Sequence, residues 1–310
     1  MQKRNVYSLL CLLGAIVVTF VGSYPLAADP LTEPFVYDRQ QPLDIQIAAV
    51  RTDQNLKIYD LTYASPAGGR VPAYLVAKAG TGSFAGVLML HGVEGSRDTS
   101  LNSAKELARA GAVVLAVSAP FARPGYSGRP GSPLTFTERD REYQIQIIQD
   151  LQRGVDLLLD RPEVDPQRLA FVGYSYGGSM GGLLAGIERR IKAYGLMVAS
   201  SGSIAFCTVG QRRHCNLNDI PPARRQPWLK AMQPIEPIRY IGHAAPATLL
   251  FLNGRHDQVI EYADASAFQQ AASQPKQVKW YDAGHGLPPE AIRDLYVWLA
   301  EQIQLNLPQS

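Results

Sequence analysis

The sequence lacks the charge imbalance and biased composition of nucleic-acid-binding, fibrous or disordered proteins. Its 30 basic and 27 acidic residues leave a formal net charge of only +3. A polyanion partner requires a strongly basic face, so no nucleic-acid partner is expected. The composition is 46% hydrophobic and 18% charged, which excludes a disordered, a collagen-like and a polytopic membrane protein. No repeat and no low-complexity tract interrupts the chain.

Long apolar runs are also absent, except at the N-terminus. Lys3 and Arg4 precede an almost uncharged apolar run over residues 6–21, which is typical of a signal peptide. We expect a signal peptide over residues 1–28, with cleavage after Ala28, and export to the periplasm or the medium. The alternative is an uncleaved N-terminal anchor, because a transmembrane helix needs about 20 apolar residues. Only that alternative would bring the protein to a membrane.

Cysteine is scarce, with three residues in the chain, and removal of the leader leaves Cys207 and Cys215. In an oxidising compartment these two residues are expected to form a disulfide. Two separately packed thiols are the alternative. A zinc site that recruits His214 has poor ligand spacing, and no metal site is predicted.

Strand and helix patterns alternate from residue 56 onward. Strands are predicted at 57–64, 71–77, 86–91, 112–118, 169–174, 193–199, 247–253 and 277–282. Helices are predicted at 100–110, 138–160, 176–187, 261–272 and 289–304. Uniformly apolar strands are typical of a parallel sheet buried on both faces. We therefore expect one α/β domain over residues 29–310, with a doubly wound, mostly parallel sheet and an antiparallel hairpin at its N-terminal edge.

Two irregular intervals interrupt this pattern. Residues 201–246, called the insertion below, are too long for an ordinary connection between a strand and a helix. We interpret the insertion as a lid over the site, and a surface insertion without a role in binding is the alternative. Residues 119–133 carry four prolines and three glycines and follow a strand end, where a loop is expected to border an active site.

The segment Gly173-Tyr174-Ser175-Tyr176-Gly177 directly follows an apolar strand and precedes a helix of small residues. A G-x-S-x-G sequence between a strand and a helix is typical of a nucleophile elbow, a sharp turn that exposes a serine hydroxyl. Glycine on each side of the turn avoids clashes with neighbouring chain. The helix N-terminus favours a developing negative charge beside the serine. Ser175 is therefore the predicted nucleophile.

A serine nucleophile needs a base, and the base needs an acid that orients it. After a nucleophile elbow the chain order is serine, acid, histidine. His285 lies between two glycines after the last predicted strand, and it is the predicted base. Asp257 follows the strand at 247–253 and is the predicted acid. Asp282 is the alternative, but it ends the strand before His285 and is expected to face away from the imidazole.

Ester hydrolysis also needs donors for a tetrahedral oxyanion, and backbone N–H groups commonly supply them. The elbow fixes the N–H of Tyr176, and a glycine-bearing loop after the strand at 86–91 supplies that of Val93. These two amides are the predicted oxyanion hole. His91 precedes the serine in the chain and is expected to brace this loop. Tyr174 and Tyr176 are candidates for an acyl pocket, with core packing as the alternative for Tyr174.

These residues resemble the α/β-hydrolases, and within them the dienelactone-hydrolase-like and acetylxylan-esterase-like carboxylesterases. The resemblance covers about residues 71–299 and rests on the strand ending in His91-Gly92, the elbow, the segment Asn253-Gly254-Arg255-His256-Asp257 and the segment Ala283-Gly284-His285-Gly286. It implies an acyl-enzyme mechanism without a metal or an organic cofactor. It implies the same nucleophile, base, acid and oxyanion amides as the residues themselves. Dienelactone hydrolases proper carry cysteine at the position of Ser175.

The sequence thus predicts an exported serine hydrolase that cleaves a small-molecule or oligomeric carboxylic ester. A peptidase resembling prolyl oligopeptidases is the enzymatic alternative, although the chain has no segment long enough for a propeller domain. A non-catalytic binding protein on the same fold is the alternative from a different class. The sequence does not indicate the acyl group, the alcohol or the oligomeric state.

Overall fold

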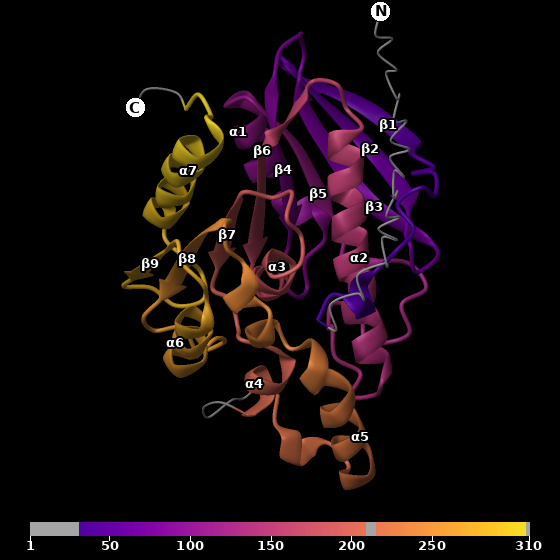
Figure 1. The fold of residues 1–310 in the computed structure, drawn as a ribbon, viewed down its shortest axis with the longest axis vertical. Coiled ribbons are helices and arrows are strands. Elements are labelled where there is room, and N and C mark those ends of the chain that lie inside the picture. Colours follow the sequence, from indigo (N-terminus) through magenta and orange to yellow (C-terminus); the bar gives the residue numbers. More distant parts are fainter. Residues whose placement is uncertain (1–30, 209–214, 308–310) are drawn as a thin grey trace, which may run out of the picture.

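The computed structural model describes residues 31–208 and 215–307. In this part of the chain nine strands form one sheet, in the spatial order β1-β2-β3-β5-β4-β6-β7-β8-β9 (Figure 1). The strands are β1 (Gln46–Asp53), β2 (Leu56–Ala64), β3 (Arg70–Lys78), β4 (Phe84–Leu90), β5 (Ala112–Val117), β6 (Val164–Tyr174), β7 (Ala193–Met197), β8 (Thr248–Gly254) and β9 (Lys276–Tyr281). The neighbouring strands in the part β5-β4-β6-β7-β8-β9 pair in parallel. The strands β1, β2 and β3 form an antiparallel edge, and β3 pairs antiparallel with β5. The predicted α/β fold with a mostly parallel sheet is confirmed.

The edge strand β1 was not predicted. The hairpin of β2 and β3 was expected at the edge of the sheet, and β1 instead pairs with β2 outside it. Every side chain of β1 is exposed or only half-buried. The strand therefore lacks the alternation of apolar and polar residues that reveals a strand with one buried face.

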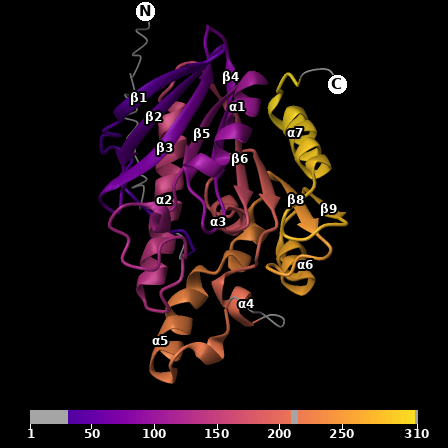
Figure 2. The same cartoon turned by 180° about the vertical axis from the view of Figure 1, so that it is seen from behind.

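Helices cover both faces of the sheet. They are α1 (Leu101–Arg109), α2 (Arg139–Leu159), α3 (Tyr176–Ala185), α4 (Ser203–Thr208), α5 (Pro222–Met232), α6 (Tyr262–Ala271) and α7 (Pro289–Ile303). The helix α2 crosses the face turned to the viewer in Figure 1, and α1 lies on the face seen in Figure 2. Buried residues of α2, α3 and α6 share one core cluster, whereas those of α1 and α7 share the other. Both faces of the central parallel strands β4, β5, β7 and β8 are therefore apolar, as their sequences predicted.

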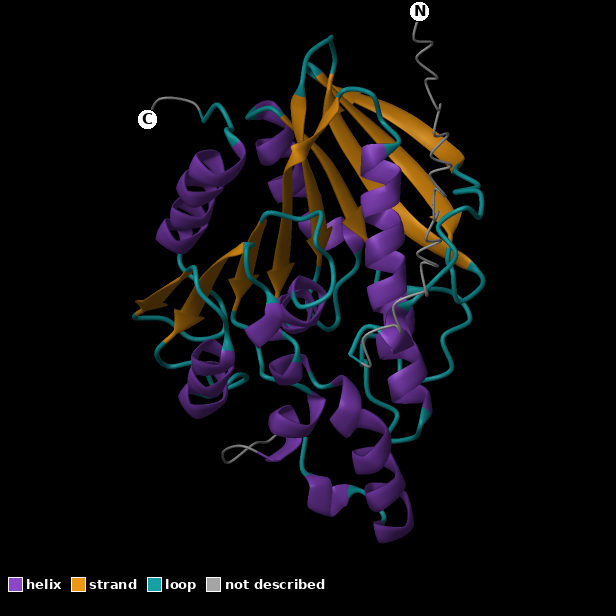
Figure 3. Ribbon diagram, viewed as in Figure 1, coloured by secondary structure: helices purple, strands orange, loops and turns teal. Residues whose placement is uncertain are grey.

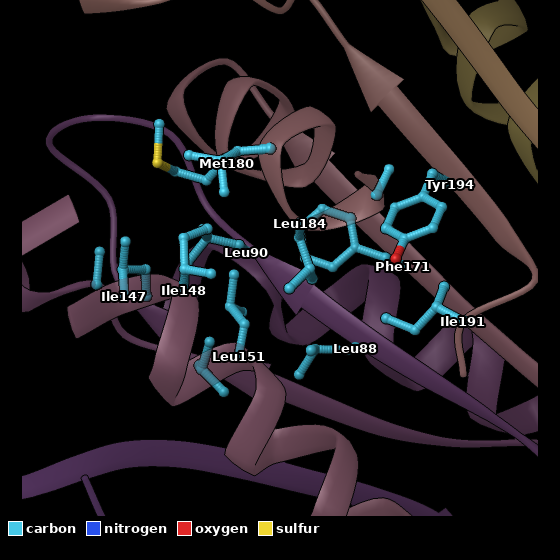
Figure 4. Close-up of a cluster of buried hydrophobic side chains, with 14 of the residues drawn as sticks. Leu88, Leu90, Ile147, Ile148, Leu151, Phe171, Met180, Leu184, Ile191 and Tyr194 are labelled. Carbon is cyan, nitrogen blue, oxygen red and sulfur yellow. The ribbon is translucent and has the colours of Figure 1, made fainter. Parts of the chain in front are cut away.

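The larger core lies between the parallel strands and the helices α2 and α3. Leu88 and Leu90 of β4 face Ile148 and Leu151 of α2 within this cluster (Figure 4). Each fully buried side chain of this size contributes about 1.5–3 kcal/mol to the free energy of folding. This packing holds rigid the strand ends that carry the candidate site.

The insertion lies beyond the carboxyl ends of the parallel strands, where α4 and α5 are found (Figure 3). Two hydrogen bonds fasten its C-terminal half to α2. Trp228 Nε1 donates to Asp140 Oδ2 at 2.7 Å, and Gln144 Nε2 donates to the carbonyl of Ile235 at 2.5 Å. The Trp228 side chain is fully buried and packs edge-to-face against Phe136. The C-terminal half of the insertion is thus tied to the body of the protein.

The predicted disulfide is present in the first half of the insertion, where Cys207 and Cys215 are bonded. His214 and the predicted signal peptide, residues 1–28, lie outside the described residues. None of the helices in the described ranges is long and apolar enough to cross a bilayer.

Candidate active site

Ser175 lies in a sharp turn between β6 and α3. Its backbone has a φ of 54° and a ψ of −114°. Residues other than glycine rarely adopt this conformation. A Cβ at Gly173 would clash with the main chain of Gly177, and a Cβ at Gly177 would clash with the carbonyl of Leu90. The N–H of Ser175 donates to the carbonyl of Met197 at 2.8 Å, which ties the turn to β7. The two glycines therefore allow the turn to pack tightly while it presents the hydroxyl.

The structure brings the predicted base and acid to this serine. His285 Nε2 lies 3.0 Å from Ser175 Oγ, and His285 Nδ1 lies 2.8 Å from Asp257 Oδ2. The other carboxylate oxygen of Asp257 accepts the N–H groups of Val259 and Ile260, each at 2.8 Å. The acid is therefore anchored by its own loop and directs one oxygen at the imidazole. All three residues come from loops at the carboxyl edge of the sheet.

The alternative acid, Asp282, has a different partner. Its Oδ1 lies 2.6 Å from Nε2 of His256, and both side chains are exposed, His256 by 70% and Asp282 by 88%. The N–H of His256 also donates to the carbonyl of Ala283 at 2.9 Å. This pair thus links the loop of the acid to the loop of the base at the protein surface, and within the described ranges no hydrogen bond or ion pair joins Asp282 to His285.

His91 braces the loop that carries Val93. Its Nδ1 lies 2.6 Å from the carbonyl of Gly92, and its Nε2 accepts the N–H of Ala119 at 3.0 Å. A neutral imidazole with the proton on Nδ1 satisfies both contacts. Burial lowers the pKa of His91 to about 4, because it disfavours the charged form. The loop is therefore held by a neutral side chain, and its Gly92 lies against Ser175.

The predicted oxyanion donors come from the elbow and from the loop whose Gly92 lies against Ser175. The N–H of Tyr176 is at the first position of α3, and the N–H of Val93 is in the loop braced by His91. Neither amide donates to an acceptor within residues 31–208 and 215–307. Both donors are therefore available, and their role in binding an oxyanion stays a prediction.

The loop over residues 119–133 borders this site, as its position after a strand end suggested. The ring of Phe121 packs edge-to-face against His91, at a centroid distance of 5.5 Å, and against Tyr176, at 5.1 Å. A small cavity beside Tyr176 is enclosed by this loop, α2 and the insertion. Its lining includes Phe121, Tyr126, Tyr143, Tyr176, Ser203 and Met232.

Sequence reasoning missed the part that Tyr126 and Tyr143 take in this cavity. The density of proline and glycine in residues 119–133 was the signal for a loop at the site, but it does not indicate which side chains of the loop face inward. Ser203 and Met232 come from the two ends of the insertion helices. The insertion thus contributes side chains to the cavity next to the elbow.

The described residues contain no group of three or more histidine, cysteine, aspartate or glutamate side chains placed to share a metal ion. The polar groups at the elbow are those of a hydroxyl, an imidazole and a carboxylate in one hydrogen-bonded row. Such a row can move a proton from the hydroxyl to the imidazole while the carboxylate stabilises the resulting positive charge.

Solved structures similar to this chain include esterases. An acetyl xylan esterase from a Paenibacillus species has a TM-score of 0.68 at 22% identity, covering 84% of this chain and 90% of its own. Acetyl xylan esterase 1 from a Thermoanaerobacterium species has a TM-score of 0.70 at 16% identity, covering 88% and 92%. An esterase from Pyrococcus furiosus has a TM-score of 0.59 at 17% identity, covering 82% and 98%. At these identities the likeness shows the fold alone.

No curated protein matches the chain by sequence. A comparison with family profiles does give a match, and it agrees with the structural comparison. The profile of the dienelactone hydrolase family matches residues 71–300, which include the strand before His91, the elbow and the loops of Asp257 and His285. The chain is therefore a member of the dienelactone hydrolase family, a hydrolase of the α/β-hydrolase fold that is similar to esterases.

Proposed function

We propose that this protein is an exported serine carboxylesterase that works through an acyl-enzyme intermediate. The observation that carries the proposal is the row of hydrogen bonds from Ser175 Oγ to His285 Nε2, at 3.0 Å, and from His285 Nδ1 to Asp257, at 2.8 Å. This row begins at a strained elbow and ends at an anchored carboxylate. The geometry matches the requirements of nucleophilic catalysis by a serine.

In the acylation step Ser175 Oγ attacks the ester carbonyl while His285 Nε2 takes the hydroxyl proton. The tetrahedral intermediate carries its negative charge on the former carbonyl oxygen, which accepts hydrogen bonds from the amides of Val93 and Tyr176. The bond to the alcohol oxygen then breaks, and His285 returns its proton to the leaving alcohol. Removal of one oxyanion donor is expected to raise the barrier by about 2.7–4 kcal/mol.

In the deacylation step a water molecule takes the place of the alcohol. His285 removes a proton from this water as it attacks the acyl carbonyl, and the bond between the acyl group and Ser175 breaks. The acid product leaves, and the serine regains its proton from the imidazole. Asp257 keeps the imidazole in one orientation and stabilises its positive charge in both steps.

The cavity beside Tyr176 is small, and the rings of Phe121, Tyr126 and Tyr143 contribute to its lining, which supports an ester with a small group on that side of the elbow. The acetyl xylan esterases with this fold make acetylated sugars the first oligomeric substrates to test. The proposed reaction uses no metal and no organic cofactor. Export is proposed from the N-terminal segment, and Edman sequencing of the protein secreted from a host cell should begin at Asp29.

Turnover of p-nitrophenyl esters and of aminoacyl anilides by the purified protein tests this proposal. We expect ester hydrolysis that falls as the acyl chain lengthens from acetate, with anilide hydrolysis far slower. Ser175→Ala should remove ester turnover. An acetylated xylo-oligosaccharide and an aromatic polyester fragment extend the panel. Anilide turnover above ester turnover would instead support a peptidase, and ester turnover retained by Ser175→Ala would contradict the nucleophile.

A further inference from the structure

We propose that Tyr174 is a positioning residue that holds the catalytic base in place, an inference that rests on the proposed function. Tyr174 ends β6 and immediately precedes the nucleophile. Its hydroxyl donates to the main-chain carbonyl of His285 at 2.5 Å. Its ring packs edge-to-face against the imidazole, with centroids 5.6 Å apart and an interplanar angle of 67°. One dipeptide thus presents the nucleophile and fastens the base.

The loop of His285 depends on this contact. Within the described ranges the main chain of residues 284–287 takes part in one hydrogen bond, the one that Tyr174 donates. The nearest main-chain bonds on either side are those of Ala283 and of Pro288, whose carbonyl accepts the N–H of Ala291. The backbone that carries the imidazole therefore has a single polar attachment to the sheet.

The bonds of the imidazole itself cannot replace this attachment throughout the reaction. The hydrogen bond between His285 Nε2 and Ser175 Oγ is present only while the serine is free. Acylation converts the hydroxyl to an ester oxygen, which has no proton to donate. His285 must then keep its place while a water molecule enters. At that stage Asp257 holds the ring through Nδ1, and Tyr174 holds the main chain beneath it. The contact therefore matters for deacylation as well as for acylation.

The environment of Tyr174 preserves its hydroxyl as a donor. Burial and the nearby charge of Asp257 both raise the pKa of Tyr174 above its ordinary value, so the phenol stays protonated wherever the enzyme would work. Tyr176, and not Tyr174, lines the cavity beside the elbow. The suggestion that Tyr174 shapes an acyl pocket is thus replaced by a role in orienting the base.

The first test compares Tyr174→Phe with Tyr194→Phe in hydrolysis of p-nitrophenyl acetate. Tyr194 on β7 also donates its hydroxyl to a main-chain carbonyl, that of Glu188 at 3.1 Å, in the core away from the site. We expect Tyr174→Phe to lower kcat by about 10- to 100-fold with little change in KM, because small misplacements of a catalytic group have effects of this size. Tyr194→Phe should keep the wild-type kcat. A kcat for Tyr174→Phe within about twofold of the wild type would overturn the proposal.

A second test does not depend on activity. The proton on His285 Nδ1, shared with Asp257, should give a downfield proton resonance in the wild type that is absent in His285→Ala. We expect this resonance to broaden through exchange with water in Tyr174→Phe and to stay sharp in Tyr194→Phe. A sharp, unshifted signal in Tyr174→Phe would overturn the role of Tyr174 even if the protein hydrolysed esters. Failure of ester hydrolysis with a broadened signal would refute the proposed function alone.

Discussion

At the scale of single residues, His91 holds its loop only as a neutral imidazole. Its Nε2 accepts the N–H of Ala119, and that nitrogen cannot accept once it is protonated. The side chain is only 2% exposed, so water cannot replace the lost contact. Protonation of His91 would therefore break the brace beneath Val93.

The neutral state of His91 predicts that the folded protein loses stability in acid. Because the pKa of His91 is lowered to about 4 in the folded protein and is about 6.5 in an unfolded chain, the unfolded state binds more protons between these values. The free energy of unfolding should then fall as the pH falls from about 6.5 to 4, by roughly 3 kcal/mol from this residue. Urea unfolding of the wild type and of His91→Gln across this range measures the difference.

The matched control is His243→Gln, which replaces an exposed histidine. We expect His243→Gln to follow the wild-type pH dependence, whereas His91→Gln should lose the component assigned to His91. Parallel curves for the wild type and His91→Gln would contradict a buried neutral imidazole.

Ser175, Asp257 and His285 could be singled out in the sequence for a physical reason. Ser175 and Asp257 follow buried parallel strands, His285 follows the parallel edge strand β9, and the carboxyl ends of parallel strands meet at one edge of the sheet. The hydrogen bond of Tyr174 to His285 could not be predicted from the sequence. It joins residues 111 positions apart, and it depends on the conformation of the loop that carries His285. The roles of Tyr126 and Tyr143 were hidden for the same reason.

At the scale of elements, Glu236 fastens the end of the insertion to its beginning. Its carboxylate accepts the N–H groups of Ser203 and Ile204 at the start of α4, each at 3.0 Å. The N–H of Ile238 donates to the carbonyl of Ser201 at 2.9 Å. The chain therefore leaves and re-enters the body of the protein at one tied point beside β7.

The buried carboxyl group of Glu236 makes this tie sensitive to pH. Burial raises its pKa to about 8, and the nearby Asp264 adds to this effect. The folded protein then binds more protons than the unfolded chain between pH 4.5 and 8, so stability should fall as the pH rises through this range. We expect Tm to decrease from pH 5 to 8 in the wild type and to lose this component in Glu236→Gln.

Glu301→Gln is the matched control, since it removes an exposed carboxylate near the end of α7. It should leave the pH dependence of Tm unchanged. If the pH dependence of Tm has the same shape in the wild type and in Glu236→Gln, Glu236 is ionised throughout this range and the prediction is wrong. A constant difference in Tm between the two proteins does not affect this conclusion.

The disulfide should stabilise the first half of the insertion. Cys207 and Cys215 are eight positions apart, and closing so short a loop contributes about 2–3 kcal/mol in the chain-entropy account. We expect alkylation of these two cysteines only after reduction, as measured by intact mass. Limited proteolysis should then cut the insertion sooner in the reduced protein. Two thiols that react without reductant in the exported protein would refute the bond.

The central parallel strands such as β4 and β5 were predictable as elements because they are apolar throughout, whereas β1 was not. The side chains of β1 are exposed or half-buried, although its last residue, Asp53, pairs with Lys105 and Arg109 of α1. Its sequence therefore carries no burial signal, and pairing with β2 defines it. The insertion was predictable as an interruption of the strand and helix pattern. Its hydrogen bonds to Asp140 and Gln144 depend on tertiary structure, and no local pattern in the sequence predicts them.

At the scale of the whole molecule, one wide sheet positions every group of the proposed reaction. The elbow follows β6, the acid follows β8 and the base follows β9, and cores on both faces hold these strands in register. The fold class followed from the alternation of strands and helices. The substrate could not be predicted in this way. The cavity is formed by the loop over 119–133, α2 and the insertion, and no local sequence pattern specifies how these segments pack.

The central claim is that Ser175, His285 and Asp257 act as one catalytic unit. Labelling by a fluorophosphonate, followed by intact mass and peptide mapping, tests it most directly. We predict one adduct per molecule, on Ser175, with labelling absent in Ser175→Ala and slower by about 10³-fold or more in His285→Ala. A wild-type protein that stays unlabelled, or a His285→Ala variant labelled at the wild-type rate, would contradict the claim and favour a binding protein on a hydrolase fold.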